Sequence, residues 1–134
     1  MTAVVSDAVA ASAATDRLKL TEIFLSLQGE ARDAGWPTVF VRLTGCPLRC
    51  QYCDTAYAFS GGEIVTLDSI LDRVAAYRPR YVCVTGGEPL VRKNIMSLVR
   101  NLGRHVESGA LEELTLTTNG SQLAKFAAEL ADCG

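Results

Sequence analysis

Hydrophobic and polar positions along the chain predict strands, turns and helices in a repeating order. Runs rich in β-branched and aromatic residues, each ended by glycine, predict strands over 38–44, 80–85 and 113–118. Apolar residues at helical spacing predict helices over 66–77, 94–106 and 121–131. Asp68 and Asn94 stand where early-helix or capping residues are expected. A further strand or hairpin arm is predicted over 20–27.

A strand, a glycine turn and a helix that repeat in this way are typical of βα units on a parallel sheet. The pattern therefore predicts an α/β fold, a partial (β/α) barrel of parallel strands with flanking helices. Units of this kind place ligands at the carboxyl ends of the strands. Three units cannot close a barrel that needs ~200 residues or more, so we expect a truncated barrel or an open half-barrel. The domain is predicted over 18–134, as the N-terminal part of such a core.

Composition narrows the class of protein. The chain has 134 residues, 49% of them hydrophobic, which is enough for the core of one domain. Its net charge of -2, from 13 basic and 15 acidic residues, predicts neither nucleic-acid nor membrane binding. The first residues lack a basic group before their apolar stretch and include Asp7, unlike a secretory signal. We therefore expect residues 1–17 to be a disordered extension and the protein to be cytoplasmic.

Three of the five cysteines form one motif, C-x3-C-x2-C, directly after the glycine that ends the first predicted strand. Cys46, Cys50 and Cys53 would therefore lie in a loop at the carboxyl end of that strand. Three thiolates can bind three irons of a [4Fe–4S] cubane and leave the fourth iron without a protein ligand, whereas ferredoxin clusters use four cysteines. The motif predicts a cluster with an open iron, and an odd cysteine count favours a reducing compartment.

Other uses of the cysteines remain open. A structural zinc site needs a fourth ligand, for which Cys83, His105 and Cys133 are the other candidates. A redox pair of Cys50 and Cys53 would leave the third cysteine of the motif unexplained. Cys83 is flanked by apolar residues in a predicted strand, so we expect it to be a core cysteine.

A second motif, Thr85-Gly86-Gly87-Glu88-Pro89, follows the next predicted strand. Paired glycines allow backbone to approach a ligand closely, and Glu88 offers a carboxylate acceptor. Taken alone, the motif is more typical of an ordinary loop than of a binding site. Together with the cysteine loop at the same end of the sheet, it predicts a binding site, to which Asn119 after the third strand could contribute.

The combination of C-x3-C-x-aromatic-C with GGEP at the end of the next strand resembles the radical S-adenosylmethionine (SAM) superfamily. The resemblance implies that Cys46, Cys50 and Cys53 hold a [4Fe–4S] cluster and that SAM completes its fourth iron. It implies SAM contacts from these further residues: Tyr52, Cys53, Asp54, Gly87, Glu88 and Asn119. Reductive cleavage of SAM would give a 5′-deoxyadenosyl radical that abstracts hydrogen from substrate, with no catalytic residues beyond the cluster and SAM.

Residues 18–90 resemble 7-carboxy-7-deazaguanine synthase, a radical SAM lyase of queuosine biosynthesis, through LTEIFLSLQGE, GWPTVFVRLTGCPLRCQYCDT and VCVTGGEPL. That family converts 6-carboxy-5,6,7,8-tetrahydropterin to 7-carboxy-7-deazaguanine. The resemblance implies Mg²⁺ on Thr55, a reductant such as flavodoxin and a homodimer. The implied contacts with the pterin substrate come from Leu27, Gln28, Gly29, Arg42 and Thr85.

Arg42 also stands out without the resemblance, because it interrupts an apolar strand where an arginine is rarely buried without a partner. A substrate carboxylate would be a bidentate partner, and an ion pair with a nearby Asp or Glu is the alternative. Thr55 by itself reads as an ordinary loop hydroxyl, although a hydroxyl with waters suits Mg²⁺.

After Leu90 the sequence resembles the molybdenum-cofactor GTP 3′,8-cyclase instead, so the chain looks composite. Thr117 occupies the position of a glutamate in the synthase pattern, and Cys83 that of a GTP-binding arginine in the cyclase pattern. The alternatives to a synthase are therefore a fragment of GTP 3′,8-cyclase and a non-catalytic iron–sulfur or zinc-binding domain.

Overall fold

The computed structural model describes residues 16–29, 34–44, 61–86, 88–92 and 94–133. These residues form one five-stranded sheet with helices, in the strand order β3-β1-β2-β4-β5. The strands are β1 (Arg17–Leu27), β2 (Pro37–Leu43), β3 (Glu63–Thr66), β4 (Tyr81–Thr85) and β5 (Glu113–Leu116). The helices are α2 (Leu67–Ala75), the 3₁₀ turn η2 (Pro89–Val91), α3 (Ile95–Glu107) and α4 (Leu123–Asp132).

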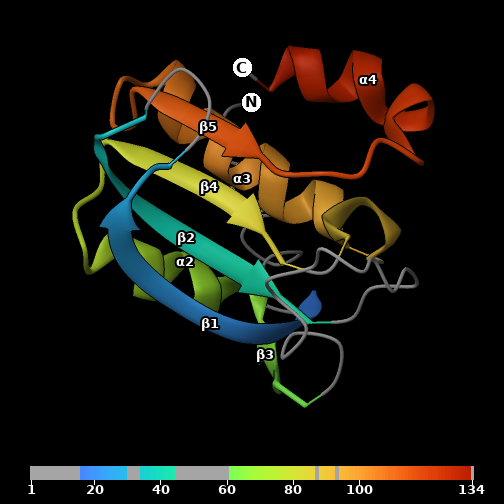
Figure 1. The fold of residues 1–134 in the computed structure, drawn as a ribbon, viewed down its shortest axis with the longest axis horizontal. Coiled ribbons are helices and arrows are strands. Elements are labelled where there is room, and N and C mark those ends of the chain that lie inside the picture. Colours follow the sequence, from blue (N-terminus) through green and yellow to red (C-terminus); the bar gives the residue numbers. More distant parts are fainter. Residues whose placement is uncertain (1–15, 30–33, 45–60, 87, 93, 134) are drawn as a thin grey trace, which may run out of the picture.

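The sheet is parallel over β2, β4 and β5, and antiparallel where β1 pairs with β2 and β3. Helices α2 and α3 lie behind the sheet in Figure 1, and α4 lies beside the carboxyl end of β5. The predicted α/β class and its repeated βα units are confirmed. The carboxyl ends of β2, β4 and β5 meet at one edge of the molecule, where such folds bind ligands.

The core fills the space between the sheet and helices α2 and α3. Val39, Val41 and Leu43 point from β2 into it, and Val82 and Val84 point from β4. The alternation along each strand sends the intervening residues to the opposite face. The helices contribute their buried stripes to the same cluster, Leu67, Ile70 and Val74 from α2 and Ile95, Met96, Leu98, Val99 and Leu102 from α3.

The helix starts follow from local hydrogen bonds. Thr66 caps α2, because its hydroxyl accepts a 3.2 Å bond from the Ser69 amide. Asn94 precedes α3 as predicted, but it adopts a left-handed conformation with φ 67° and makes no side-chain cap bond. Its side-chain amide instead donates to the Arg17 carbonyl at 3.1 Å, which ties the start of α3 to the start of β1.

Two features lie outside the sequence predictions. Strand β3 pairs with the first half of β1 and places Arg17 inside the sheet, one residue before the predicted start of the domain. The register between β1 and β2 shifts between Leu20 and Glu22, which marks a β-bulge. None of the helices in the described part of the chain has the length and hydrophobicity of a membrane span.

Candidate functional site

The face of the sheet opposite α2 and α3, called here the open face, carries polar side chains near the carboxyl ends of β2 and β4. Arg42 pairs in register with Glu22 of β1 on one side and with Thr85 of β4 on the other. Thr117 follows β5, and its amide donates to the Val84 carbonyl at 2.9 Å. Glu22, Arg42, Thr85 and Thr117 therefore form a row across the sheet.

Arg42 contacts two side chains of β1, Glu22 and Phe24. Its Nη1 donates to Glu22 Oε1 at 2.6 Å, and its guanidinium carbon lies 5.0 Å from the centroid of the Phe24 ring. Phe24 stacks on Phe40 with ring centroids 5.1 Å apart. The side chain of Arg42 is 18% exposed and that of Glu22 is 39% exposed. The ion-pair alternative for Arg42 is thus observed, and its predicted contact with substrate stays a prediction.

Cys83 is buried, as predicted, but it faces the open side of the sheet and not the helices. Its thiol lies 3.6 Å from the Thr117 hydroxyl and 3.9 Å from the Val84 carbonyl. Thr117 therefore shares the open face with Cys83, while Thr118 turns to Glu88. Thr117, which occupies the position of a glutamate in the synthase pattern, thus lies on the open face.

Gly86, directly after β4, packs against the base of Arg42. Its φ is +84°, and a Cβ at this residue would lie 2.3 Å from Arg42 Cγ and 2.7 Å from the Leu43 carbonyl oxygen. Only glycine combines this conformation with this approach at little cost. Gly86 thus makes a close backbone approach to Arg42 and Leu43, and the predicted approach of this segment to a ligand stays a prediction.

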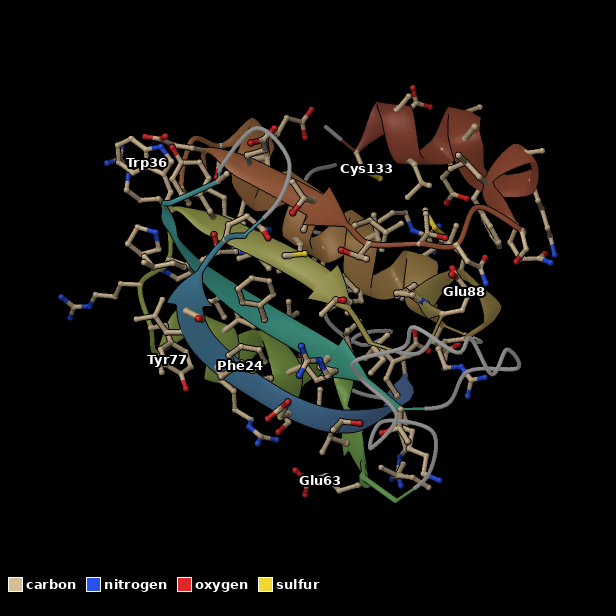
Figure 2. The ribbon with its side chains drawn as sticks, in the orientation of Figure 1. Phe24, Trp36, Glu63, Tyr77, Glu88 and Cys133 are labelled. Atoms are coloured by element: carbon tan, nitrogen blue, oxygen red, sulfur yellow. The ribbon has the colours of Figure 1, made fainter. Side chains whose placement is uncertain are left out.

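Glu88 is fully buried and ties two strand ends together. Its carboxylate accepts bonds from the Thr118 hydroxyl at 2.5 Å, the Asn119 amide at 2.6 Å and the Leu90 amide at 3.2 Å. Figure 2 shows Glu88 beside the segment that leads from β5 to α4. Glu88 and Asn119, both predicted to bind SAM, are thus brought together, here through a bond between the Asn119 backbone and the Glu88 carboxylate.

The predicted cluster loop starts and ends at one place. Thr44, which follows β2, donates from its amide to the Lys19 carbonyl at 2.9 Å, and its hydroxyl lies 2.7 Å from that of Thr21. Gly62 lies so close that a Cβ there would be 2.2 Å from the Thr44 hydroxyl oxygen. Residues 45–60 are thus bracketed at the carboxyl end of β2.

Several predicted site residues lie outside the described residues. They are Cys46, Cys50, Tyr52, Cys53, Asp54, Thr55 and Gly87. Within the described ranges no group of three or more His, Cys, Asp or Glu side chains could hold a metal ion. The surroundings of the loop fit a cluster, because Thr44 and Gly62 hold the two ends of a segment with three cysteines close together at the carboxyl end of β2.

The predicted substrate turn lies elsewhere. Leu27 pairs with Pro37 at the amino end of β2, whereas Glu22 pairs with Arg42 near its carboxyl end. Five residue steps at ~3.4 Å each separate the two positions by ~17 Å. Gln28 lies in a turn, where its amide donates to the Trp36 carbonyl at 3.0 Å and its carbonyl accepts from the Gly35 amide at 2.7 Å. The structure therefore joins Arg42 with Thr85 but does not join them with Leu27, Gln28 and Gly29.

Cys133, the fifth cysteine, packs against helix α3. Burial raises the pKa of the Cys133 thiol, and Glu129 adds to the shift. The Cys133 backbone packs on Gly103 of α3, where a Cβ would lie 2.6 Å from the Cys133 carbonyl oxygen. Arg100 of α3 pairs with Glu129 of α4 beside it. Because cysteine ligands bind metals as thiolates, a thiol with a raised pKa is a poor candidate for the fourth ligand of a zinc site.

Sequence reasoning missed Glu22 and the bond that Thr118 makes to Glu88. Glu22 lies in LTEIF, where its alternation with Phe24 indicates a shared face, but the bulge that sets this face is not visible in the pattern. Thr118 stands in the Thr-Asn-Gly turn that was predicted to reach a ligand, and its hydroxyl binds Glu88.

Comparison with known proteins gives three results. The sequence pattern of the Radical SAM superfamily matches residues 40–134. The GTP 3′,8-cyclase of Agrobacterium fabrum is 61% identical over 95 residues, which cover 66% of this chain and 27% of that protein. The GTP 3′,8-cyclase of Mesorhizobium japonicum is 57% identical over 96 residues, with 66% and 28% covered. The chain thus spans little more than a quarter of the length of these relatives.

Among solved structures, QueE from Escherichia coli superposes with a TM-score of 0.65 and 25% sequence identity, covering 84% of this chain and 57% of that one. The superfamily uses a [4Fe–4S] cluster and SAM, which agrees with the cluster predicted from the cysteine motif. Since the pattern covers most of the chain, the chain belongs to the radical SAM superfamily.

Proposed function

We propose that the chain acts as a radical SAM lyase of the 7-carboxy-7-deazaguanine synthase type, on 6-carboxy-5,6,7,8-tetrahydropterin. One observation carries this proposal: Arg42 stands on the open face at the carboxyl end of β2, ion-paired and stacked on Phe24. An arginine that is mostly shielded from water binds a carboxylate strongly and in a fixed direction. The structural likeness to QueE, which is a 7-carboxy-7-deazaguanine synthase, extends over most of the chain and supports the same choice.

Each group would have a defined part. When bound, the cluster on Cys46, Cys50 and Cys53 and its SAM supply the radical that removes hydrogen from the substrate. Arg42 would bind the carboxylate of the pterin, and the Thr85 hydroxyl beside it would donate or accept one further bond. Glu88 would hold the loop after β4 against Asn119. Atoms balance because the pterin rearranges to the product with loss of one ammonia.

The proposal also includes features that rest on the resemblance. Thr55 would bind Mg²⁺, with waters completing an oxygen shell. A small reductant such as flavodoxin would deliver the electron, and the protein would work as a cytoplasmic homodimer.

A second candidate is GTP 3′,8-cyclase, which is favoured by identities of 55–61% with such enzymes. Against it stands Cys83, a buried cysteine at the position of a GTP-binding arginine in that family. Both substrates share a 2-amino-4-oxopyrimidine ring, so the two candidates differ mainly in the anionic group to be bound, a carboxylate or a triphosphate.

The test is a product assay under anaerobic conditions. The protein is reconstituted with iron and sulfide, supplied with SAM and a reductant, and given the carboxylated tetrahydropterin or GTP in parallel. We expect 7-carboxy-7-deazaguanine from the first, and a Cys50→Ala control without cluster, cleaved SAM or product. A cyclised GTP product would favour the second candidate. A wild-type protein that holds iron but never cleaves SAM would support a non-catalytic domain instead.

A further inference from the structure

Glu22 reaches the open face through the bulge in β1. Before the bulge, Leu18 and Leu20 point into the core, where they are 4% and 1% exposed. Strict alternation would send residue 22 to the same side as residue 20. The register shift between Leu20 and Glu22 reverses this, so the carboxylate lies opposite Arg42 instead. Bulges near binding sites commonly re-aim a side chain in this way.

The Glu22–Arg42 pair presents an acceptor and a donor side by side. Their bond joins Nη1 and Oε1, and the guanidinium and the carboxylate are groups that can take part in several hydrogen bonds at once. The Glu22 side chain, 39% exposed, is the more accessible partner. A ligand with a carboxylate and an N–H on neighbouring atoms would match the pair, its carboxylate on Arg42 and its N–H on Glu22.

We propose that Glu22 is a second substrate-binding residue, which accepts a hydrogen bond from an N–H next to the carboxylate of the ligand. This inference rests on the proposed function, because the carboxylated tetrahydropterin has this arrangement: its carboxylate is on C6 and the adjacent N5 carries hydrogen. Arg42 then selects the anion, and Glu22 selects the reduced ring.

Glu22 also acts against the wrong ligand. In oxidised 6-carboxypterin the carboxylate remains, but N5 has a lone pair and no hydrogen. That lone pair would face the Glu22 carboxylate, and two acceptors in contact without a proton repel each other. A purely positioning role, in which Glu22 only orients Arg42, would instead affect both carboxylated ligands by the same factor.

The test compares affinities for three ligands by anaerobic equilibrium dialysis, with reconstituted protein and SAM but without reductant. They are 6-carboxy-5,6,7,8-tetrahydropterin, oxidised 6-carboxypterin and 5,6,7,8-tetrahydropterin, which lacks the carboxylate. We expect wild-type protein to prefer the first over the second by at least tenfold. Glu22→Gln, whose amide can donate to the bare N5, should reduce this ratio at least tenfold. Any effect of ring shape is common to both proteins and cancels from the comparison.

Glu63→Gln is the matched control, because Glu63 also pairs with an arginine, Arg73 at 3.0 Å, on the exposed side of β3. It should leave the ratio unchanged. Glu22→Asp keeps the charge but moves it back by the length of one methylene, so it should lower the affinity ratio without reversing it. This variant replaces Glu22→Gln in the test if the Gln variant does not fold.

One result would overturn the inference about Glu22, and a different result would overturn the proposed function. If Glu22→Gln lowers the affinity for both carboxylated ligands by the same factor, so that their ratio is kept, Glu22 is a positioning residue. This result would refute the inference but not the proposed function. A wild-type protein that binds 5,6,7,8-tetrahydropterin as tightly as its carboxylated form would overturn the proposed function, and this inference with it.

Discussion

Gly86, directly after β4, packs against the side chain of Arg42. We expect Gly86→Ala to lower the free energy of unfolding by about 2 kcal/mol or more, because it adds a clash to an unfavourable positive φ. Urea unfolding measures the change.

Gly35→Ala separates the two causes. Gly35 has a similar φ of +87°, but nothing lies within 4 Å of a Cβ built there. This variant should lose only the conformational part, about 1 kcal/mol. Equal losses in the two variants would show that packing against Arg42 contributes nothing.

Glu112 offers a pH-dependent test at the amino end of β4. Its pKa lies below the ordinary value because the Tyr81 hydroxyl donates to it at 2.7 Å and Arg80 pairs with it. A carboxyl whose folded pKa is lowered stabilises the fold above its unfolded pKa, and this contribution is lost as pH falls through the folded pKa. Tyr81→Phe should move the pKa of Glu112 toward the ordinary value in an NMR titration.

The remaining Arg80 should keep that pKa somewhat low in the Tyr81→Phe protein. Tyr77→Phe is the control, since the Tyr77 hydroxyl bonds to the Ile23 carbonyl and not to Glu112. A Glu112 titration that is the same in wild-type and Tyr81→Phe protein would contradict the assigned cause.

At the scale of elements, the bond from Thr118 to Glu88 joins the end of β5 to the loop after β4. Thr118→Val keeps the shape but removes the donor from a fully buried carboxylate. We expect the free energy of unfolding to fall by about 1.5–3 kcal/mol, as for hydrogen bonds to charged groups. Thr115→Val, which removes only a 3.5 Å contact with the Val82 carbonyl, should cost far less. Similar losses in both would contradict a special role for the Glu88 contact.

The sequence pattern located β2, β4, β5 and the three α-helices because each carries several apolar residues in a clear period and ends at a turn residue. The pattern did not predict β3, because this strand has only four residues, two of them exposed, and its pairing with β1 is a long-range contact. For the same reason the pattern could place Arg42 in a strand but could not name its partner. Glu22 meets Arg42 only after a bulge, which depends on tertiary packing.

For the whole molecule, the chemistry of the open face predicts how well the proposed reaction proceeds. Thr117, on that face beside Cys83, is uncharged, whereas a glutamate could accept bonds from the amino and ring N–H groups of the pterin. Thr117→Glu should raise turnover of the carboxylated tetrahydropterin by roughly 30- to 1000-fold, the equivalent of about 2–4 kcal/mol. SAM cleavage without substrate should not change. Fast turnover by the wild type, with no gain in the variant, would refute this assignment.

The meeting of Thr44 and Gly62 at the end of β2 has a consequence for cofactor loading. Bringing together the ends of a segment as long as the 17 residues between Thr44 and Gly62 costs an unfolded chain roughly 2.5 kcal/mol of entropy in the length-dependent part. Here the sheet already holds both ends, through the Thr44 bond to Lys19 and the packing of Gly62 on Leu20. Assembly of a cluster on cysteines of this segment would therefore not have to supply that free energy. Iron uptake should accordingly depend on the integrity of the β1–β3 pairing.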